Sequence, residues 1–410
     1  MPVHLDRLPA KAFRPARPRL WLWLTLLGLC LLAGVVGALL FAPVALREQP
    51  ARFWALAIGL PMLGWVLLGF ARAVVYSGQH GAADGWDDAR KADLDRRLRR
   101  ARRSQQVLAV SLQTALRAPG AAQPVQLVAL LGNTAGLKTQ PCSITGETAR
   151  HSRLPGDLSE APALAALRVM KQLLDDLKPA LAQVAETTPL ALLLQLDSGA
   201  AEKDQREAWQ QAWRESAFPQ PVTPLEGSGL AALDDWLDQR IADPAMLLVV
   251  AVQLAPTALE GAAQVAVGLL LGNRLTQTRL APIAYLYRPE QERQPAPEHL
   301  LYAAQQALLW APLEPQAVRD TWRAGVDPAR DGAVATALAQ VALPAQNTSR
   351  FHNLDALLGQ AGGAAAWLAI AAAAQAAESG AGPQFIFSGD GSAGAGLWGT
   401  AVSPAAPISK

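Results

Sequence analysis

The sequence predicts an α/β protein in which an N-terminal two-helix transmembrane hairpin precedes one layered α/β/α domain with mixed sheets. The runs Leu20–Ala42 and Phe53–Ala71 contain no charged residue, and each is long enough to cross a hydrocarbon core of about 30 Å. After about residue 72, short apolar segments alternate with amphipathic ones. We therefore expect a membrane hairpin over 1–76, a basic juxtamembrane helix or linker over 77–104, and a soluble domain over 105–410.

The flanking charges predict the orientation of the hairpin. Basic side chains precede the first run and follow the second, whereas the link Pro43–Arg52 carries only Arg47, Glu48 and Arg52. Because basic residues stay on the cytoplasmic side, both termini should be cytoplasmic. The alternative is a cleaved signal peptide, but the sequence offers no convincing small-residue cleavage site and a second run follows at once.

A basic segment comes next. Gly78–Trp86 is expected to be a loop and Asp87–Gln106 an arginine-rich helix. Its arginines would contact anionic lipid head groups or form a solvated face with Asp93 and Asp95 as partners. A nucleic-acid role is not expected, because no aromatic residues are interleaved with the arginines and the net charge is only +2.

The remaining elements follow from periodicity and from Pro and Gly punctuation. Helices are expected at Ala161–Ala185, Glu202–Ser216, Gly227–Ile241, His299–Leu309, Ala333–Val341 and Ala361–Ala377. Strands are expected at Val107–Leu112, Val125–Leu131, Leu190–Leu196, Met246–Leu254, Val265–Leu271, Ile283–Tyr287, Phe385–Ser388 and Leu397–Val402. Ala361–Ala377 is apolar on every side, so it should be buried all round, between two sheets.

Residues typical of metal or cofactor sites are sparse. The two cysteines, Cys30 in the first apolar run and Cys142 in the soluble part, are not expected to pair. The five histidines lack metal-ligand spacing. No Gly-rich stretch ends in the Lys-Ser/Thr of a phosphate loop. We expect neither metal nor cofactor.

Three motifs, in order, resemble the thiolase-like fold of ketoacyl synthases. Gly227-Ser228-Gly229-Leu230 opens a helix and is followed by the strand Met246–Leu254, as at that family's nucleophile. Glu260-Gly261-Ala262-Ala263 precedes a strand, as a similar motif does there. Leu358–Ala365 resembles the family's Leu-Gly-Ala-Ala-Gly helix start, and Ser388–Gly391 resembles its C-terminal turn.

The sequence also departs from that family. A Cys nucleophile with two His, or with His and Asn, is the family's catalytic set, but Leu225–Gly229 contains no Cys. The family has a His-Gly-Thr-Gly-Thr loop after the corresponding strand, whereas Arg288-Pro289-Glu290 follows the strand Ile283–Tyr287 here. The second family His falls near Ala356, before Gly359, and His352 and Asn353 lie too early.

We therefore expect a catalytically inactive domain without catalytic residues. It would keep a vestigial nucleophile region at Gly227, Ser228 and Gly229 and a vestigial second-histidine region at Ala356 and Gly359. For Ser228 the alternative is an ordinary helix N-cap.

A membrane hairpin before such a domain resembles the adaptors and effector chaperones of type VI secretion clusters. That resemblance implies a bacterial inner-membrane protein that holds a toxin effector for loading onto a secretion spike, with effector or spike protein and inner-membrane lipid as partners. It leaves open a homodimer. Two alternatives remain: a membrane-tethered acyltransferase or ketoacyl synthase-like enzyme using Ser228 or Cys142, and a structural inner-membrane component of an envelope machine.

Overall fold

The computed structural model describes residue 5 and residues 8–121, 123–142, 146–157, 159–256, 258–344 and 349–405. Arg7, which belongs to the basic residues before the first run, lies outside these ranges. The chain forms two compact units, one ending at Arg97 and the other beginning at Leu98.

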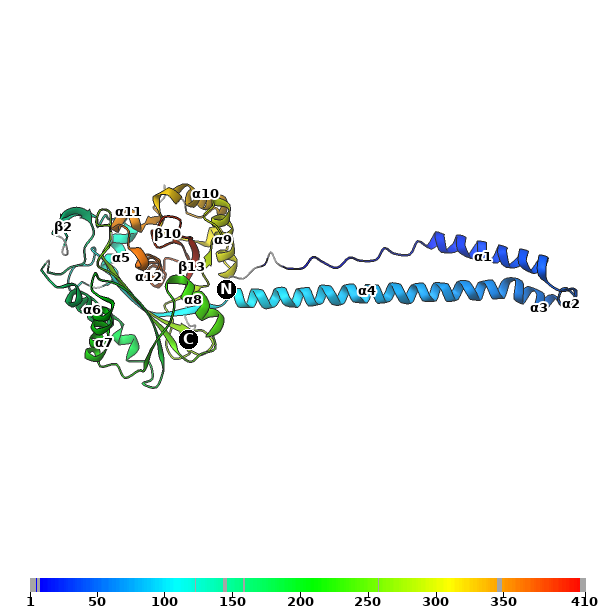
Figure 1. Ribbon diagram of the computed structural model, residues 1–410, viewed down its shortest axis with the longest axis horizontal. Helices are drawn as coiled ribbons and strands as arrows, with labels where there is room; N and C mark the ends of the chain where they lie inside the picture. Colours follow the sequence, from blue (N-terminus) through cyan, green and yellow to red (C-terminus); the bar gives the residue numbers. More distant parts are fainter. Residues whose placement is uncertain are drawn as a thin grey trace. The chain divides into compact units, whose positions relative to one another are not determined.

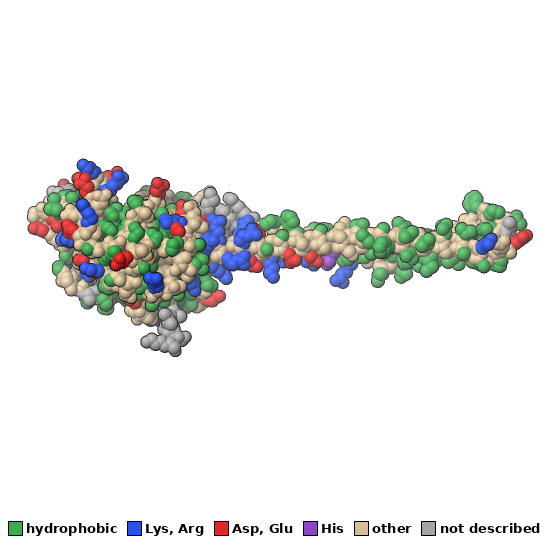
Figure 2. Space-filling model, turned by 90° about the horizontal axis from the view of Figure 1, so that it is seen from below, with side chains coloured by type: hydrophobic (Ala, Val, Ile, Leu, Met, Phe, Trp, Pro, Cys, Tyr) green, Lys and Arg blue, Asp and Glu red, His purple; other side chains and the backbone are tan. Residues whose placement is uncertain are grey.

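The first unit is helical. It contains α1 (Leu20–Phe41), α2 (Val44–Arg47), α3 (Pro50–Trp54), the π-helical turn η1 (Ala55–Gly59) and α4 (Leu60–Ala101), whose last turn belongs to the second unit. Two helical stretches, Leu20–Phe41 and Pro50–Ala101, are long and apolar enough to cross a membrane. Hydrophobic side chains cover the part of this unit formed by α1 and the first half of α4, and charged side chains appear at its tip and along the later part of α4 (Figure 2).

Close packing joins the two apolar helices. Gly34 lies against Ala57 and Pro61, where an added Cβ would be 2.2 Å from a Pro61 ring carbon. Trp65 donates from its indole nitrogen to the carbonyl of Trp23 at 2.9 Å, and the two rings meet edge to face. Trp65 is therefore a packing residue of the helix pair.

The expected loop Gly78–Trp86 is wrong, because α4 continues through it without a break. Its glycines suggested a loop, but the flanking residues are good helix formers and an N-terminal arm binds along this stretch. Asp87 accepts from the backbone N–H of Ala12 at 3.0 Å, and Trp86 donates to the carbonyl of Ala10 at 3.1 Å. Between Arg72 and Arg97 this helix is about 39 Å long at helical rise.

The second unit consists of two halves with the same strand order. One half contains β1 (Ser104–Gln113), β4 (Leu190–Asp197), β5 (Val222–Pro224), β6 (Met246–Gln253) and β7 (Val265–Asn273). The other contains β8 (Ala284–Tyr287), β10 (Asp320–Ala324), β11 (Phe351–Asn353), β12 (Gln384–Ser388) and β13 (Trp398–Pro404). The sheet order is β5-β4-β6-β7-β1 in the first half and β11-β10-β12-β13-β8 in the second.

Strand directions repeat as well. In each half the first three strands of that order are parallel, and the fourth is antiparallel to both of its neighbours. The halves meet where β1 pairs with β8 from Ser104 to Val107. Smaller pairings link β9 (Glu290–Gln291) to β13 and β2 (Lys138–Pro141) to β3 (Thr148–His151). The equal order indicates two copies of one folding pattern.

Helices fill three layers around these sheets (Figure 1). An outer layer, α6 (Pro162–Leu181) with α7 (Glu202–Ser216), buries apolar side chains against β4, β6 and β7. The other outer layer, α9 (Pro297–Trp310) with α10 (Asp331–Val341), packs on the second half. Between the sheets lie α8 (Gly229–Gln239) and α12 (Ala365–Glu378), whose apolar side chains join both halves in one core.

The predicted burial of the Ala-rich helix is confirmed. Every α12 residue from Ala365 to Ala377 is buried. Its methyl side chains let the two halves of the sheet approach closely, and the Trp367 indole donates to the Gln195 side chain. The chain thus adopts a layered fold of mixed strands and helices, with α12 buried at its centre.

One expected strand was wrong, and several elements of the structure were not predicted. The segment Val125–Leu131 is not a strand but lies in helix α5 (Gln123–Leu131). Its continuous apolar pattern fits either structure at this length. The strands β5, β10 and β11, helix α11 (Leu354–Leu358) and the 3₁₀ turns η2 (Pro315–Ala317), η3 (Pro328–Arg330) and η4 (Gly362–Ala364) were not predicted.

Strand β5 forms one end of the sheet order. It bonds to β4 through the carbonyl of Pro221, which accepts from Leu190, and through the N–H of Leu225, which donates to Leu192. Pro224, within the strand, has no N–H to donate. The outer side of this edge therefore lacks a donor at that position.

Candidate functional site

The predicted nucleophile region lies at the start of α8. Gly227 has φ of 102°, a left-handed value that glycine adopts without strain, and it leads into Ser228. Ser228 occupies the N-cap position with an extended backbone, but its side chain makes no capping hydrogen bond. The residue is exposed. The geometry thus places Ser228 at a helix start, with no described base bonded to its hydroxyl.

The second vestigial region surrounds α11. Ala356 is exposed, and its N–H donates to the Asn353 side chain, which caps the helix. Gly359 follows with φ of 101°, and an added Cβ would lie 2.5 Å from the carbonyl oxygen of Gly261. Glycine is needed here because two backbones pass very close together.

That contact joins two of the motifs. Gln360 donates its N–H to the carbonyl of Gly261 at 2.8 Å, and its own carbonyl accepts from Ala263 at 2.9 Å. The segment Glu260–Ala263 therefore pairs with the start of Leu358–Ala365. The small residues of both motifs allow this crossing, which is a structural reason for their composition.

A buried carboxylate lies one residue before Ala356. Asp355 accepts hydrogen bonds from the backbone N–H groups of Gly325 at 2.7 Å and Val326 at 3.1 Å. Burial raises the pKa of Asp355 to about 6, although these two bonds oppose the rise. Two adjacent N–H groups directed at one oxyanion are the arrangement that stabilises a tetrahedral intermediate in acyl transfer. Here the chain's own carboxylate already occupies them.

Sequence reasoning missed Asp355 and the Gly325–Val326 turn. The turn follows β10, whose sequence Asp-Thr-Trp-Arg-Ala has charged residues at two positions and did not look like a buried strand. Both charges are paired inside the fold: Asp320 accepts from Gln384, and Arg323 pairs with Asp331. The one available signal was Gly325 beside Asp327-Pro328, a turn sequence.

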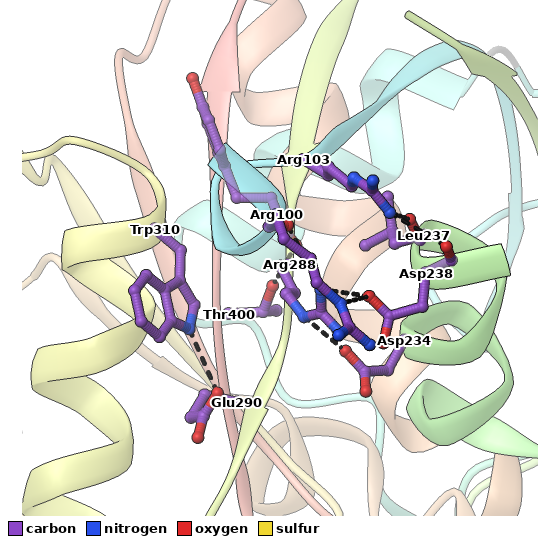
Figure 3. A network of polar contacts seen from close by, with 10 residues as sticks. Arg100, Arg103, Asp234, Leu237, Asp238, Arg288, Glu290, Trp310 and Thr400 are labelled. Carbon is purple, nitrogen blue, oxygen red and sulfur yellow. Dashed lines mark hydrogen bonds and ion pairs between the residues drawn. The ribbon is translucent and has the colours of Figure 1, made fainter. Parts of the chain in front are cut away.

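A second polar cluster surrounds Arg288 (Figure 3). Its side chain is 0% exposed and pairs with two residues of α8, Asp234 at 2.7 Å and Asp238 at 2.8 Å. Burial by itself would raise the pKa of Asp238, but hydrogen bonds from Arg100 and Arg288 hold it well below its usual value. Arg288 thus has a structural role. It stands at the position where the sequence comparison expected the family's His-containing loop.

The same cluster binds the end of α8. Arg103 donates to the carbonyls of Leu237 at 2.8 Å and Asp238 at 3.0 Å, in the last turn of that helix. Cations stabilise this end of a helix because its carbonyls carry partial negative charge. Two of the juxtamembrane arginines, Arg100 and Arg103, are therefore engaged inside the second unit, which is a third role beside the two weighed from sequence.

Glu290 lies close by in β9 and is almost fully buried. Its carboxylate accepts from the Trp310 indole at 3.1 Å. Burial raises the pKa of Glu290 to about 7, and the bond from Trp310 only partly offsets that rise. An ionisable group poised near neutrality is a common feature of active sites, but Glu290 lines neither of the cavities considered next.

A cavity of about 310 Å³ opens on the first half, and one of about 530 Å³ lies between the first half and the C-terminal end of α12. Neither is lined by the residues of the two vestigial regions. Cys142, the alternative nucleophile considered from the sequence, is buried, and its backbone N–H donates to the Glu147 carbonyl. Among the described residues, no group of three or more His, Cys, Asp and Glu side chains is placed to hold a metal ion.

Comparisons with known proteins agree with this architecture. No protein-family model and no curated protein matches the sequence. Solved structures do match. The ishigamide ketosynthase/chain length factor is 17% identical with a TM-score of 0.53, covering 74% of this chain and 100% of that chain.

A β-ketoacyl synthase from Burkholderia phymatum is 13% identical with a TM-score of 0.51, covering 74% of this chain and 100% of that chain. The PfaC keto synthase–chain length factor is 12% identical with a TM-score of 0.51, covering 75% of this chain and 43% of that one. At these identities the similarity establishes the fold. This chain has a thiolase-like fold.

Proposed function

We propose that this protein is a membrane-anchored, catalytically inactive thiolase-like adaptor. One observation carries the proposal: the adjacent amides of Gly325 and Val326 are bonded to the two carboxylate oxygens of Asp355, so neither is free to stabilise an oxyanion. An ionised carboxylate in that position would repel a developing oxyanion. A neutral one would still have to be displaced.

The nucleophile region supports the same proposal. Leu225–Gly229 offers Ser228 as its one hydroxyl, and a serine needs an adjacent base to become nucleophilic. No hydrogen bond joins Ser228 Oγ to any such base among the described residues. The two long apolar helices support the anchor. Under this proposal the adaptor is held at a bacterial inner membrane, with the second unit in the cytoplasm.

The finer part of the proposal concerns the partner. By its resemblance to type VI secretion accessory proteins, the adaptor would hold a toxin effector and deliver it to the spike. Tagged full-length protein, extracted in mild detergent after co-expression with the effector and spike genes of the same cluster, should capture one of those proteins. Capture of neither would refute this part.

Catalytic inactivity has its own test. Full-length protein in detergent is incubated with acetyl-, octanoyl- and palmitoyl-coenzyme A, and its intact mass is recorded. We expect no added acyl group. A covalent adduct that disappears in Ser228→Ala or in Cys142→Ala would instead identify an acyltransferase and its nucleophile. A fixed complex formed without any effector would favour a structural envelope component.

A further inference from the structure

The 530 Å³ cavity is an apolar groove in the second unit, between its first half and helix α12 of its second half. It lies among β1, α5, α6 and the C-terminal end of α12, and aliphatic side chains such as Leu108, Val110, Leu127 and Ile283 form its walls. Leu108 sits at a β-bulge, where the register of β1 against β7 shifts between Val107 and Ala109. Bulges redirect side chains, which explains why successive residues of β1 line one groove.

Apolar surface continues outside the groove on α5. Pro124 and Leu127 of this helix line the cavity, while Val125 and Val128 are 60% and 71% exposed. Three residues apart on a helix, these two valines lie on one face. An exposed aliphatic pair beside an apolar groove is a surface that a partner would cover.

The rim carries an unbalanced negative charge. Glu378 lies in the last turn of α12, where the helix carbonyls are partly negative and no basic residue is present. Among the described residues its carboxylate has no hydrogen-bond or ion-pair partner, and burial raises its pKa. The other rim carboxylate, Asp176, differs because it accepts from Ser111, Gln113 and Arg117.

We propose that this groove binds a segment of a partner protein in which apolar side chains flank a Lys or Arg. The apolar residues would enter the groove and cover Val125 and Val128, and the cation would pair with Glu378. A small ligand would leave the two valines exposed, so the observations favour a protein segment. The inference rests on the adaptor function and deepens it by naming the face that holds the partner.

The direct test uses full-length protein in detergent and two labelled peptides. In one peptide two leucines, a helical turn apart, flank a lysine; in the other a glutamate replaces the lysine. Fluorescence anisotropy should show the lysine peptide binding about tenfold tighter or more. Glu378→Lys should reverse the preference, and Val128→Asp should weaken both. The matched control is Glu207→Lys on the outer helix α7, which should change nothing.

Three results would overturn the groove assignment: equal binding of the two peptides, a preference that Glu378→Lys leaves unchanged, or binding of labelled dodecanoate with neither peptide. Because Glu378 and Val128 are at the surface, circular dichroism should be unaltered in both variants. If Val128→Asp misfolds, Glu378→Lys decides alone.

Effector capture separates this inference from the proposed function. Capture by the wild type and equal capture by Glu378→Lys would refute the groove and leave the adaptor standing. Lysine-peptide binding without any effector capture would refute the adaptor and leave the groove as a peptide site. Loss of capture in Glu378→Lys, with retention in Glu207→Lys, would support both.

Discussion

The backbone N–H of Gly325 donates to the carboxylate of Asp355 at 2.7 Å, linking the turn after β10 to helix α11. Val326 adds a second bond to the same carboxylate. These bonds hold together the two segments of the second half that approach the central helix layer. Asp355 therefore has a structural task, which is to bond the amides of this turn to the start of helix α11.

Asp355→Ala should destabilise the second unit by about 1–3 kcal/mol, because it leaves two buried N–H groups without an acceptor. Asp355→Asn retains one acceptor oxygen and should cost less. Chemical denaturation of full-length protein in detergent, followed by tryptophan fluorescence, measures both. A loss equal in the two variants would contradict the role of the amide bonds.

Glu290→Gln should stabilise the protein at pH 8 and have little effect at pH 5. The pKa of Glu290 is raised from 4.5 to about 7 in the folded protein. Its contribution to stability is therefore fully present below about pH 4.5 and is lost as pH rises through about 7. Glutamine is never ionised and keeps an acceptor for Trp310. Unfolding midpoints at the two pH values test this, and an equal shift at both would contradict it.

Arg288→Met should be among the most damaging single changes, at roughly 3–5 kcal/mol, because Asp234 and Asp238 lose their buried cation. Adding Asp234→Leu should recover part of that loss. The control is Arg206→Met, which breaks an exposed pair with Glu202 and should change the unfolding midpoint little. A midpoint shift no larger than that control's would mean that the cluster is dispensable.

Gly359→Ala and Ser228→Ala should behave very differently. The first forces a Cβ against the Gly261 carbonyl at a left-handed φ, so expression and thermal stability should fall sharply. The second removes a hydroxyl that makes no capping bond, and its cost should stay below about 1 kcal/mol. Under the adaptor proposal effector capture survives Ser228→Ala. Loss of function in a well-folded Ser228→Ala protein would instead favour an enzyme.

The proposed membrane anchor makes a topological prediction. Alkaline phosphatase is active only outside the cytoplasm, so it should be inactive when fused after Lys410, outside the described residues, and active when inserted at Gln49 between the two apolar helices. A cytoplasmic reporter should give the opposite result at both positions. Phosphatase activity at the C-terminus would overturn the charge argument.

The architecture could be predicted because the outer helices keep amphipathic patterns, while several strands and the Ala-rich helix keep continuous apolar ones. Met246–Gln253 and Ala365–Glu378 are examples. Strand β10 was not predicted because its charged residues are buried through partners on other elements: Asp320 accepts from Gln384, 64 residues later, and Arg323 pairs with Asp331 and Asp355. No local pattern contains such pairings. Helix α5 was predicted as a strand because a short apolar run fits a buried strand and a buried helix equally well.

The candidate site could be predicted only in part. Small-residue motifs pointed to the start of α8 and to Gly359, and the latter is constrained by the backbone crossing at Gly261. The sequence did not indicate a role for Asp355, because its hydrogen-bond donors lie in the turn after β10, a strand that was not predicted. The groove around Glu378 combines side chains from β1, α5, α6 and α12. Only the folded structure shows that these side chains form one groove and that the Glu378 carboxylate has no ion-pair partner among the described residues.

The proline of β5, Pro224, affects how copies of this protein can associate. Proteins often extend a sheet across a subunit boundary by pairing edge strands, and this requires an unbroken row of N–H groups. Because Pro224 has no N–H group, the row of donors on the outer side of this three-residue strand is interrupted at its last residue. Self-association at this edge would have to rely on side chains, and each molecule is protected there against uncontrolled growth of the sheet from one copy to the next.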